Sequence, residues 1–426
     1  MTVSTQTTST TRWTQLVLGL IAMMSISSPS YVWTLFTKPF QDNLHSNLPA
    51  VQITFSIVIV LQTWLSPLQG YLIDKFGARL LITTGCLLSG LGWVTSAYVT
   101  DLAGLYFTYG LLCGIGTGIV NIGIIGLMVR WFPDRRGFAT GIVAAGVGFG
   151  AIVTTFPIDN MLKSTGYQHT LVAFGIILAV IGAGAALFLR MPGPQDVLPP
   201  VSVLASSLNV APQMMLRNKV FWLLFVMMTM MSTGGLMIIS QFAAFSRDFG
   251  VASVIVFGLA ALPLALTVDR ITNGLTRPFF GWLSDRIGRE NTMAIAFLME
   301  AAAVSIMVLL RNNAPIFVIL SAVVFFGWGE VFSLFPSTLT DTFGTKYATT
   351  NYGFLYMAHG IGSVLGGPLA ALLHDATGSW LPVFGIIIAM DALTGILALA
   401  LLKPMRGRSI SARMMVPNWM ELLRNS

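Results

Sequence analysis

Charged side chains interrupt one otherwise apolar stretch of the sequence, residues 269–278. Asp269, Arg270 and Arg277 lie in a run that is apolar enough to cross a membrane. A charged side chain near the centre of a bilayer costs between ~3 and more than ~10 kcal/mol, so such residues normally face a cavity, a partner or a ligand. Arg270 and Arg277 are seven residues apart with Asn273 between them, which predicts that these three side chains share one helix face.

Arg277 is the best candidate for contacting a substrate. No acidic residue lies four positions from it, whereas Asp269 can neutralise Arg270 or a cation of a neighbouring helix. The guanidinium presents a planar fork of donors that matches the two oxygens of a carboxylate. The alternative is a permanent ion pair with Glu330 or another acid. We favour the substrate, because a fully satisfied buried pair could be replaced by apolar residues at little cost.

Two further polar residues, His359 and Glu330, are predicted to lie at a depth in the membrane similar to that of Arg277. Arg277 lies eight residues before Asp285 at the inner surface, about 12 Å into a core about 30 Å thick. His359 lies eight residues after Asn351, where its run enters from the same side, and is also about 12 Å deep. Glu330 comes out about 16 Å deep. His359 is either a second electrostatic contact or a neutral core residue, and Glu330 is either a proton carrier or the partner of a cation.

The composition is that of a polytopic membrane protein. Of the 426 residues 55% are hydrophobic and 9% are charged, whereas a soluble globular chain carries about 25% charged residues. The net charge of +7 comes from basic residues dispersed between apolar runs, so no nucleic-acid partner is expected. The two cysteines, Cys86 and Cys113, lie in apolar runs and offer neither a disulfide framework nor a metal site. No metal or other cofactor is expected.

Twelve apolar runs are long enough to span a bilayer. They lie near residues 14–37, 50–72, 80–99, 103–129, 138–158, 169–190, 219–245, 253–283, 291–310, 314–340, 352–373 and 380–402. The longest polar gap follows the sixth run and is rich in proline, as is typical of a linker. The expected divisions are a six-helix N-terminal half (1–190), a cytoplasmic linker (191–218), a six-helix C-terminal half (219–403) and a cytoplasmic tail (404–426).

The positions of Lys and Arg predict the orientation of the chain. With the N-terminus inside, seventeen basic residues flank the inner ends of the runs and four flank the outer ends. Both termini are therefore expected in the cytoplasm, and the protein is expected to be a multi-pass protein of the plasma (cytoplasmic) membrane. The first eleven residues lack the basic region and cleavage site of a signal peptide, so we expect the first run to be a retained helix.

A short pattern after the second run recurs after the eighth. Residues 70–79 read GYLIDKFGAR and residues 281–289 read GWLSDRIGR, at an offset of 211 residues. The aspartates are anions at the cytoplasmic surface that can contact a helix N-terminus in the opposite half, and the glycines permit close helix approach and a tight turn. We predict a gating role for these loops; the alternative is that their basic residues only set the topology. The gating candidates are Gly70, Asp74, Arg79, Gly281, Asp285 and Arg289.

This duplicated pattern, G-x-x-x-D-[KR]-x-G at equivalent places in a chain of twelve runs, resembles the signature loop of the major facilitator superfamily. Other strings resemble one branch of it, the oxalate:formate antiporter family, which is related to the monocarboxylate transporters. These strings are Tyr31 to Leu35, Arg130 to Asp134, Asn273 to Phe279, Trp328–Gly329 with Leu334 to Thr338, and Asn351 to Phe354. The resemblance covers nearly the whole chain. It implies an all-α membrane protein with the major facilitator fold, twelve transmembrane helices in two pseudo-symmetric six-helix halves.

The resemblance also implies a binding site: an Arg in the eighth helix and a Lys in the eleventh that bind a small carboxylate inside an aromatic cage. Arg277 and Trp328 match this pattern. Three positions depart from it, with His359 in place of the Lys, Tyr356 in place of a Trp and Asn121 in place of a Tyr. Uncharged residues are expected at the positions of Asp269, Arg270 and Glu330. Two fixed cations suit a dianion such as oxalate, whereas one Arg with a titratable His suits a monoanion, with a coupled proton as a second ligand.

We therefore predict a secondary active transporter, not an enzyme, that moves a small organic carboxylate by alternating access as an anion exchanger and works as a monomer in the lipid bilayer. The alternatives are a proton-coupled symporter of lactate-like acids and, less favoured, a transport-dead carboxylate sensor. The predicted substrate-binding residues are Arg277, His359, Asn273, Tyr31, Trp33, Asn121, Trp328 and Tyr356. The candidates for coupling or charge pairing are Glu330, Asp269 and Arg270. Glu300 and Asp391, which also lie in apolar runs, have no predicted role.

Overall fold

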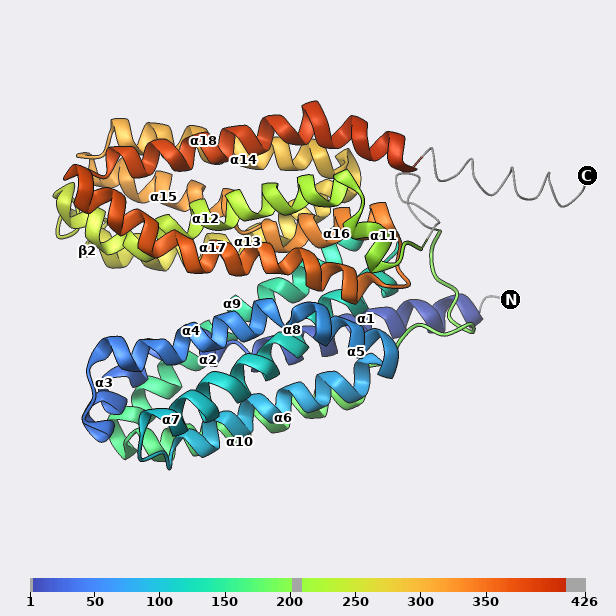
Figure 1. Cartoon of the computed structure of the whole chain (residues 1–426), viewed down its shortest axis with the longest axis horizontal. Helices are drawn as coiled ribbons and strands as arrows, with labels where there is room; N and C mark the ends of the chain where they lie inside the picture. Colours follow the sequence, from blue (N-terminus) through green and yellow to red (C-terminus); the bar gives the residue numbers. More distant parts are fainter. Residues whose placement is uncertain (1–2, 201–208, 411–426) are drawn as a thin grey trace, which may run out of the picture. The chain divides into compact units, whose positions relative to one another are not determined.

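The computed structural model describes residues 3–200 and 209–410, and this part of the chain is almost entirely helical (Figure 1). The elements up to residue 200 are α1 (Val3–Ser25), α2 (Ser28–Tyr31), α3 (Trp33–Leu44), α4 (Leu48–Trp64), α5 (Ser66–Phe76), α6 (Ala78–Ser96), α7 (Leu102–Leu105), the π-helix η1 (Tyr106–Cys113), α8 (Gly114–Trp131), α9 (Arg136–Thr165) and α10 (Tyr167–Leu187).

The elements after residue 209 are α11 (Pro212–Leu216), α12 (Lys219–Asp248), β1 (Ile255–Val256), β2 (Leu259–Ala260), α13 (Ala261–Ile287), α14 (Arg289–Leu309), α15 (Ala314–Trp328), α16 (Val331–Phe343), α17 (Ala348–Thr377), α18 (Leu381–Leu397) and the π-helix η2 (Ala398–Leu402).

The predicted membrane spans are each found as a helix or as a bent helix pair. Within residues 3–200 and 209–410, nine helical stretches are long and apolar enough to cross a bilayer. Two further spans are bent pairs, α1–α2 with α3 at 45° and α4 with α5 at 50°. The remaining predicted span is α13, whose 27 residues reach about 40 Å at 1.5 Å each. Its length is sufficient, and its charged residues explain its lower hydropathy.

The bend between α4 and α5 has a local cause in the sequence. Pro67 has no backbone N–H, so the carbonyl of Thr63, four residues earlier, loses its helical donor. The hydroxyl of Ser66 donates to that carbonyl instead. The carbonyl of Thr63 therefore keeps a donor at the kink, as irregular helix inside a membrane requires.

By its contacts the chain divides into two units. Unit 1 comprises Met1–Asp134, Ile142–Pro200 and Tyr347–Gly360, and unit 2 comprises Arg135–Gly141, Val201–Lys346 and Ile361–Ser426. Two helices belong to both: α9 begins in unit 2 and continues in unit 1, whereas α17 begins in unit 1 and continues in unit 2. The division of the chain at residues 190 and 219 stays a prediction.

Unit 1 contains an aromatic core. The ring of Trp33 lies 4.7 Å from that of Tyr109 and 5.9 Å from that of Phe40, measured between centroids. The Trp33 indole N–H donates to Gln52 at 2.9 Å, and the Tyr109 hydroxyl donates to the carbonyl of Pro29 at 2.9 Å. Buried Trp and Tyr side chains need such partners for their polar atoms. The indole of Trp33 and the hydroxyl of Tyr109 are therefore hydrogen-bonded as well as packed.

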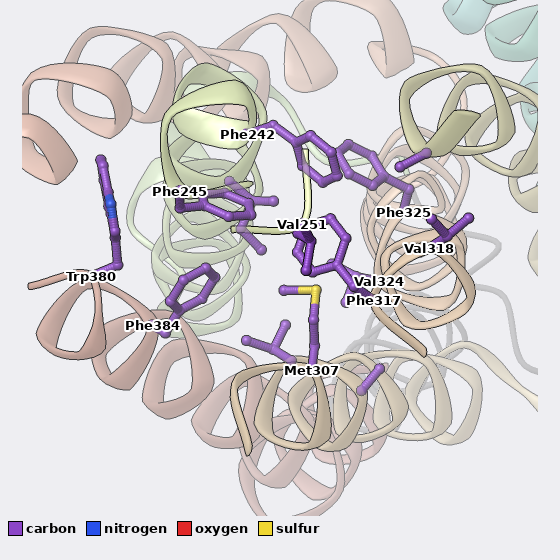
Figure 2. Close-up of a cluster of buried hydrophobic side chains, with 14 of the residues drawn as sticks. Phe242, Phe245, Val251, Met307, Phe317, Val318, Val324, Phe325, Trp380 and Phe384 are labelled. Carbon is purple, nitrogen blue, oxygen red and sulfur yellow. The ribbon is translucent and has the colours of Figure 1, made fainter. Parts of the chain in front are cut away.

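Unit 2 has an aromatic core of its own, formed by α12, α15 and α18 (Figure 2). The rings of Phe245 and Phe384 meet edge to face with centroids 5.0 Å apart, and Phe242 lies 5.6 Å from Phe317. Trp380 closes the cluster at the start of α18, where its indole N–H donates to Asp248 at 2.6 Å. Edge-to-face rings add about 0.5–1.5 kcal/mol per pair beyond their burial.

The run predicted at 253–283 begins differently from a helix. Strands β1 and β2 form an antiparallel hairpin at its start, and α13 begins only at Ala261. The two loop residues, Phe257 and Gly258, have φ of 50° and 84°. Two-residue hairpin loops require positive φ at these positions, and glycine supplies it without strain. Because an apolar run of Val, Ile and Phe reads equally as strand or helix, only Gly258 signalled the turn.

Candidate functional site

Arg277 is buried in the second half of α13, with 5% of its surface exposed. Its Nη2 donates to the Oδ1 of Asn273 at 3.2 Å, and its guanidinium carbon lies 4.7 Å from the centroid of the Phe332 ring. The spacing of four residues thus brings Asn273 and Arg277 together on one helix face, as the sequence predicted. A cation over an aromatic face contributes about 0.5–2 kcal/mol and fixes the plane of the guanidinium.

Phe332, on α16, is a site residue that the sequence analysis missed. Its ring meets the ring of Trp328 edge to face at 5.8 Å while it lies against Arg277. The Trp328 indole N–H donates to the carbonyl of Met231 at 2.9 Å, and any side chain at Gly235 would overlap the indole. The ring of Phe332 therefore contacts both Arg277, the predicted cation, and Trp328, a residue of the predicted aromatic wall. No spacing in the sequence signalled Phe332, because the helix breaks between Trp328 and Phe332.

The structure separates Asp269 from Arg270. Asp269 is buried and accepts a hydrogen bond from the hydroxyl of Ser321 at 3.0 Å, whereas Arg270 is exposed. Within residues 3–200 and 209–410 no ion pair joins the two. Adjacent residues on a helix point about 100° apart, so Asp269 and Arg270 could pair only if one side chain turned toward the other. Asp269 accepts a hydrogen bond from Ser321 instead.

Glu330 lies fully buried at the break between α15 and α16. Its backbone carbonyl accepts from the amides of Ser333 at 2.9 Å and Leu334 at 2.8 Å. Its carboxyl group is within electrostatic range of Arg277, but among the described residues it makes no ion pair and no hydrogen bond. A permanent Arg277–Glu330 pair, the alternative to substrate binding, is therefore not formed in this conformation.

The other predicted binding residues belong to unit 1. His359 and Tyr356 stack on one another along α17, with ring centroids 5.5 Å apart and planes 27° apart. Trp33 is enclosed in the aromatic core, Tyr31 is 44% exposed, and Asn121 is buried in α8. The structure therefore brings Tyr356 and His359 together within this unit and places the ring of Trp33 among protein side chains.

The two repeated loops have the same local structure. Gly77 and Gly288 end α5 and α13 with nearly identical backbone angles, φ 94° and ψ 153° against φ 93° and ψ 154°. Only glycine adopts this conformation readily. Both loops make a turn of this kind, as the sequence predicted. At Gly70 a Cβ atom would lie 2.5 Å from the carbonyl oxygen of Thr349, so the close helix approach is confirmed as well.

Both loop aspartates accept hydrogen bonds at the start of a long helix. Asp74 accepts from the Thr350 amide at 2.9 Å and from its hydroxyl at 2.6 Å, in the first turn of α17. Asp285 accepts from the amides of Gly137 at 3.0 Å and Phe138 at 2.8 Å, in the first turn of α9. The first amides of a helix have no partner within the helix and carry its positive dipole end. The predicted contact with a helix N-terminus is therefore present in both repeats.

The basic residues of the two loops are used differently. Arg289 pairs with Asp285 at 2.6 Å and with Asp341 at 2.8 Å, and Arg136 pairs with Asp341 at 2.6 Å. Arg79, which lies five residues after Asp74 whereas Arg289 lies four after Asp285, instead donates from Nε to the carbonyl of Leu189 at 3.1 Å. The charge network of unit 2 is therefore not repeated at Arg79, where the two sequence patterns differ by one residue.

Comparison with known proteins identifies the family. The family model described as Major Facilitator Superfamily matches residues 16–271 and 262–426. A protein named oxalate:formate antiporter from Oxalobacter formigenes is 34% identical over 391 residues, which cover 92% of this chain and 90% of the relative. Monocarboxylate transporter 13 of Bos taurus is 27% identical over 345 residues, covering 79% of this chain and 77% of the relative.

Solved structures agree on the fold. The transporter FucP in the outward conformation superposes with a TM-score of 0.66 at 16% identity, covering 90% of this chain and 97% of FucP. The proton:xylose symporter XylE superposes with a TM-score of 0.67 at 11% identity, covering 92% of this chain and 96% of XylE. At these identities the likeness concerns the fold alone. Because the family model matches nearly the whole chain and the fold agrees, this chain belongs to the Major Facilitator Superfamily of multi-pass membrane transporters.

Proposed function

We propose that this transporter moves a small organic carboxylate across the cytoplasmic membrane by alternating access, as an anion exchanger. The observation that carries the proposal is the buried cation Arg277, oriented by Asn273 and Phe332. Similarity to an oxalate:formate antiporter and to a monocarboxylate transporter supports a carboxylate as the ligand. The proposed substrates are oxalate, formate and similar mono- or dicarboxylates.

The chemistry of Arg277 suits a carboxylate better than a neutral solute. Charge-assisted hydrogen bonds from a guanidinium to a carboxylate are about twice as strong as neutral ones, and burial strengthens them. The rings of Phe332 and Trp328 give the guanidinium an apolar surrounding in which water competes poorly. A bound carboxylate would therefore compensate a charge that is expensive to keep inside a membrane.

His359 is proposed as the second electrostatic contact. It stacks on Tyr356, and histidine is the side-chain type that most readily changes charge in the physiological range. A neutral His359 leaves one fixed cation and suits a monoanion, whereas a protonated His359 suits a dianion. The charge of the preferred substrate should therefore follow the protonation of this residue.

We also propose that both termini are cytoplasmic and that the repeated loops gate the cytoplasmic face. Asp74 and Asp285 each hold the first turn of a long helix through two hydrogen bonds. Movement of α17 or α9 during the cycle requires these bonds to break. The loops would therefore set the energy difference between conformations, while Arg277 binds the substrate.

A second candidate function is proton-coupled symport of a monocarboxylate. The observation that favours it is the presence in unit 2 of buried carboxyl groups without hydrogen-bond partners among the described residues, Glu330 among them. A proton gradient that drives net uptake into substrate-free proteoliposomes would select symport. Uptake that requires a carboxylate inside the vesicle would select exchange.

The substrate class is tested by thermal shift of the purified protein against a panel of small mono- and dicarboxylates. A ligand that binds only the folded state raises the apparent melting temperature, with a gain of about 2.7 kcal/mol at a hundred times its dissociation constant. We expect stabilisation by one or more carboxylates and none by the corresponding alcohols or amides. Stabilisation by sugars but not by any carboxylate would contradict the proposed function.

A further inference from the structure

Three acidic side chains from separate parts of the sequence gather inside unit 2. Glu300 lies on α14, Glu330 at the break between α15 and α16, and Asp391 on α18, and each has 0% of its surface exposed. Helix α14 packs against both α15 and α18, as can be followed in Figure 1. Asp391 is within electrostatic range of both glutamates, and Glu330 of Glu300. We call these three residues the carboxyl trio.

A glycine on a facing helix makes room for one member of the trio, and a second glycine lies against another member. A Cβ atom at Gly327 on α15 would lie 2.7 Å from the Cβ of Glu300, closer than real side chains approach. A Cβ atom at Gly234 on α12 would lie 3.4 Å from Oδ1 of Asp391, in van der Waals contact with that oxygen. Gly327 is therefore needed for the position of Glu300, whereas Gly234 only lies close to Asp391.

The oxygens of the trio have no protein partner within the described residues. None of the six carboxyl oxygens accepts a hydrogen bond, and none lies in an ion pair. Other buried acids of the same unit have donors: Asp269 accepts from Ser321 through Oδ1, although its Oδ2 has no partner among the described residues, and Asp341 accepts from Arg136 and Arg289. Asp391 is the independent sign of a ligand, because it comes from a third helix, is fully buried, has no hydrogen-bond partner among the described residues, and lies within electrostatic range of both glutamates.

Three ionised carboxylates could not remain in this position. Removing an unpaired carboxylate from water is strongly unfavourable, and like charges within electrostatic range of one another add to that cost. A metal ion would require convergent ligands, and no group of three or more His, Cys, Asp or Glu side chains in residues 3–200 and 209–410 has the geometry for one. The ligand that this arrangement fits is the proton.

We propose that Glu300, Glu330 and Asp391 form a proton-binding site in unit 2 whose occupancy is linked to the binding of the transported anion. The proton resides on a carboxyl oxygen and leaves to water when the site opens during the cycle. This inference rests on the proposed binding of a carboxylate at Arg277, and it favours the second candidate function, proton-coupled transport, over exchange alone.

The neighbours of the trio provide the linkage. Arg277, on α13, is within electrostatic range of Glu330. When an anion neutralises Arg277, Glu330 gains affinity for a proton; when the anion leaves, the positive charge favours release of that proton. By reciprocity the proton must raise the affinity for the anion by the same factor. Other acids on the packed elements have partners of their own, Asp269 with Ser321 through one oxygen, Glu290 with Arg406, and Asp341 with Arg136 and Arg289. The part of α12 that faces Asp391 carries no titratable group.

The test uses proteoliposomes with the membrane potential clamped and a carboxylate found by the thermal-shift panel. In the wild type, an inward gradient of one pH unit should support accumulation of up to about tenfold for each proton coupled. Glu300→Gln, Glu330→Gln, Asp391→Asn and the triple variant should lose this accumulation while counterflow exchange persists. Glu330→Asp, which keeps a carboxyl group, should recover part of it. Asp159→Asn, at an exposed pair with Lys163, is the control and should behave as the wild type.

Protein stability gives a second, independent readout. If the trio holds protons only in the folded state, the melting temperature of the wild type should fall as the pH rises from about 6 to about 9, because the unfolded chain then binds fewer protons than the folded one. The triple variant should lose this part of the pH dependence. Amides are close in shape to neutral carboxyl groups, so the single variants should fold; failure of all three to fold would contradict a protonated trio.

Three outcomes would overturn the inference. The first is carboxylate exchange in the wild type with no response to a pH gradient. The second is an unaltered proton response in the triple variant. The third is a sodium gradient that replaces the proton gradient, which would make the ligand a metal cation. Failure of the proposed function looks different, because no carboxylate would then bind or exchange in the wild type or in any variant.

Discussion

Two neighbours orient the guanidinium of Arg277, and they differ in how far the sequence predicts them. Asn273 lies one helical turn earlier on the same helix, so the spacing of four residues placed it correctly. Phe332 lies on another helix, and the break at Gly329–Glu330 changes the direction of the chain before α16 begins. Because that break depends on tertiary packing, no periodicity in the sequence could predict which ring would meet Arg277.

Removal of the Asn273 amide should weaken carboxylate binding without abolishing it. Asn273→Ala removes the hydrogen bond to Arg277 Nη2, and a hydrogen bond to a charged group is worth about 1.5–3 kcal/mol. We expect the dissociation constant of the carboxylate, measured by titration calorimetry, to rise about tenfold. Asn43→Ala, which removes an exposed amide that donates to the Val99 carbonyl, should leave it unchanged. An unaltered affinity in Asn273→Ala would mean that Arg277 needs no orientation.

At the scale of elements, the duplicated loops show that one sequence pattern gives one local structure but not one set of partners. Gly77 and Gly288 form the same turn, and both aspartates reach a helix N-terminus. The turn at each glycine and the aspartate that accepts the hydrogen bonds were predictable, because they depend on a few adjacent residues. The partners of Arg79 and Arg289 were not, because they lie on segments distant in the sequence.

The contact between Asp285 and the first turn of α9 should protect two backbone amides. In Asp285→Asn the side chain loses its charge and one of its two acceptor oxygens, so we expect faster hydrogen exchange at Gly137 and Phe138 and a loss of about 1 kcal/mol of stability. Asp101→Asn, at a similar cap that accepts from the Gly104 amide, is the control for a cap outside the repeat. It should alter exchange only near residue 104. Unchanged exchange at Phe138 in Asp285→Asn would refute the gating contact.

The start of the linker should loosen in acid. The hydrogen bonds from Arg190 to Asp196, at 2.6 and 2.8 Å, hold the pKa of that carboxyl below its usual range, and the Gly193 amide adds to the effect. A lowered pKa in the folded state stabilises the segment above the ordinary pKa of Asp, about 4, and the stabilisation is lost as the pH falls through the lowered value. Hydrogen exchange of the Gly193 amide, corrected for its intrinsic pH dependence, should therefore accelerate in that window. Asp196→Asn should exchange fast at every pH; if it matches the wild type at neutral pH, the ion pair does not hold the segment.

At the scale of the whole molecule, the apolar runs of the sequence predicted where the long helices and bent helix pairs of the described residues lie, because such runs have few alternatives inside a bilayer. It did not predict the hairpin before α13, where strand and helix fit the same apolar letters. It also left Glu300 and Asp391 without a role. Their meeting with Glu330 depends on how α14, α15 and α18 pack, and residues that are far apart in the sequence carry no local sign of such a meeting.

The central claim is that Arg277 binds the carboxylate, and counterflow of a labelled carboxylate into loaded proteoliposomes tests it most directly. Arg277→Ala should lower the rate at least about a hundredfold, since two charge-assisted hydrogen bonds are lost, and Arg277→Lys should restore only part of it. Arg311→Ala removes another arginine that lies over a ring, that of Phe249, and should leave the rate within about twofold of the wild type. Size-exclusion profiles and melting curves confirm that each variant is inserted and folded. Near-normal counterflow by folded Arg277→Ala would contradict the account.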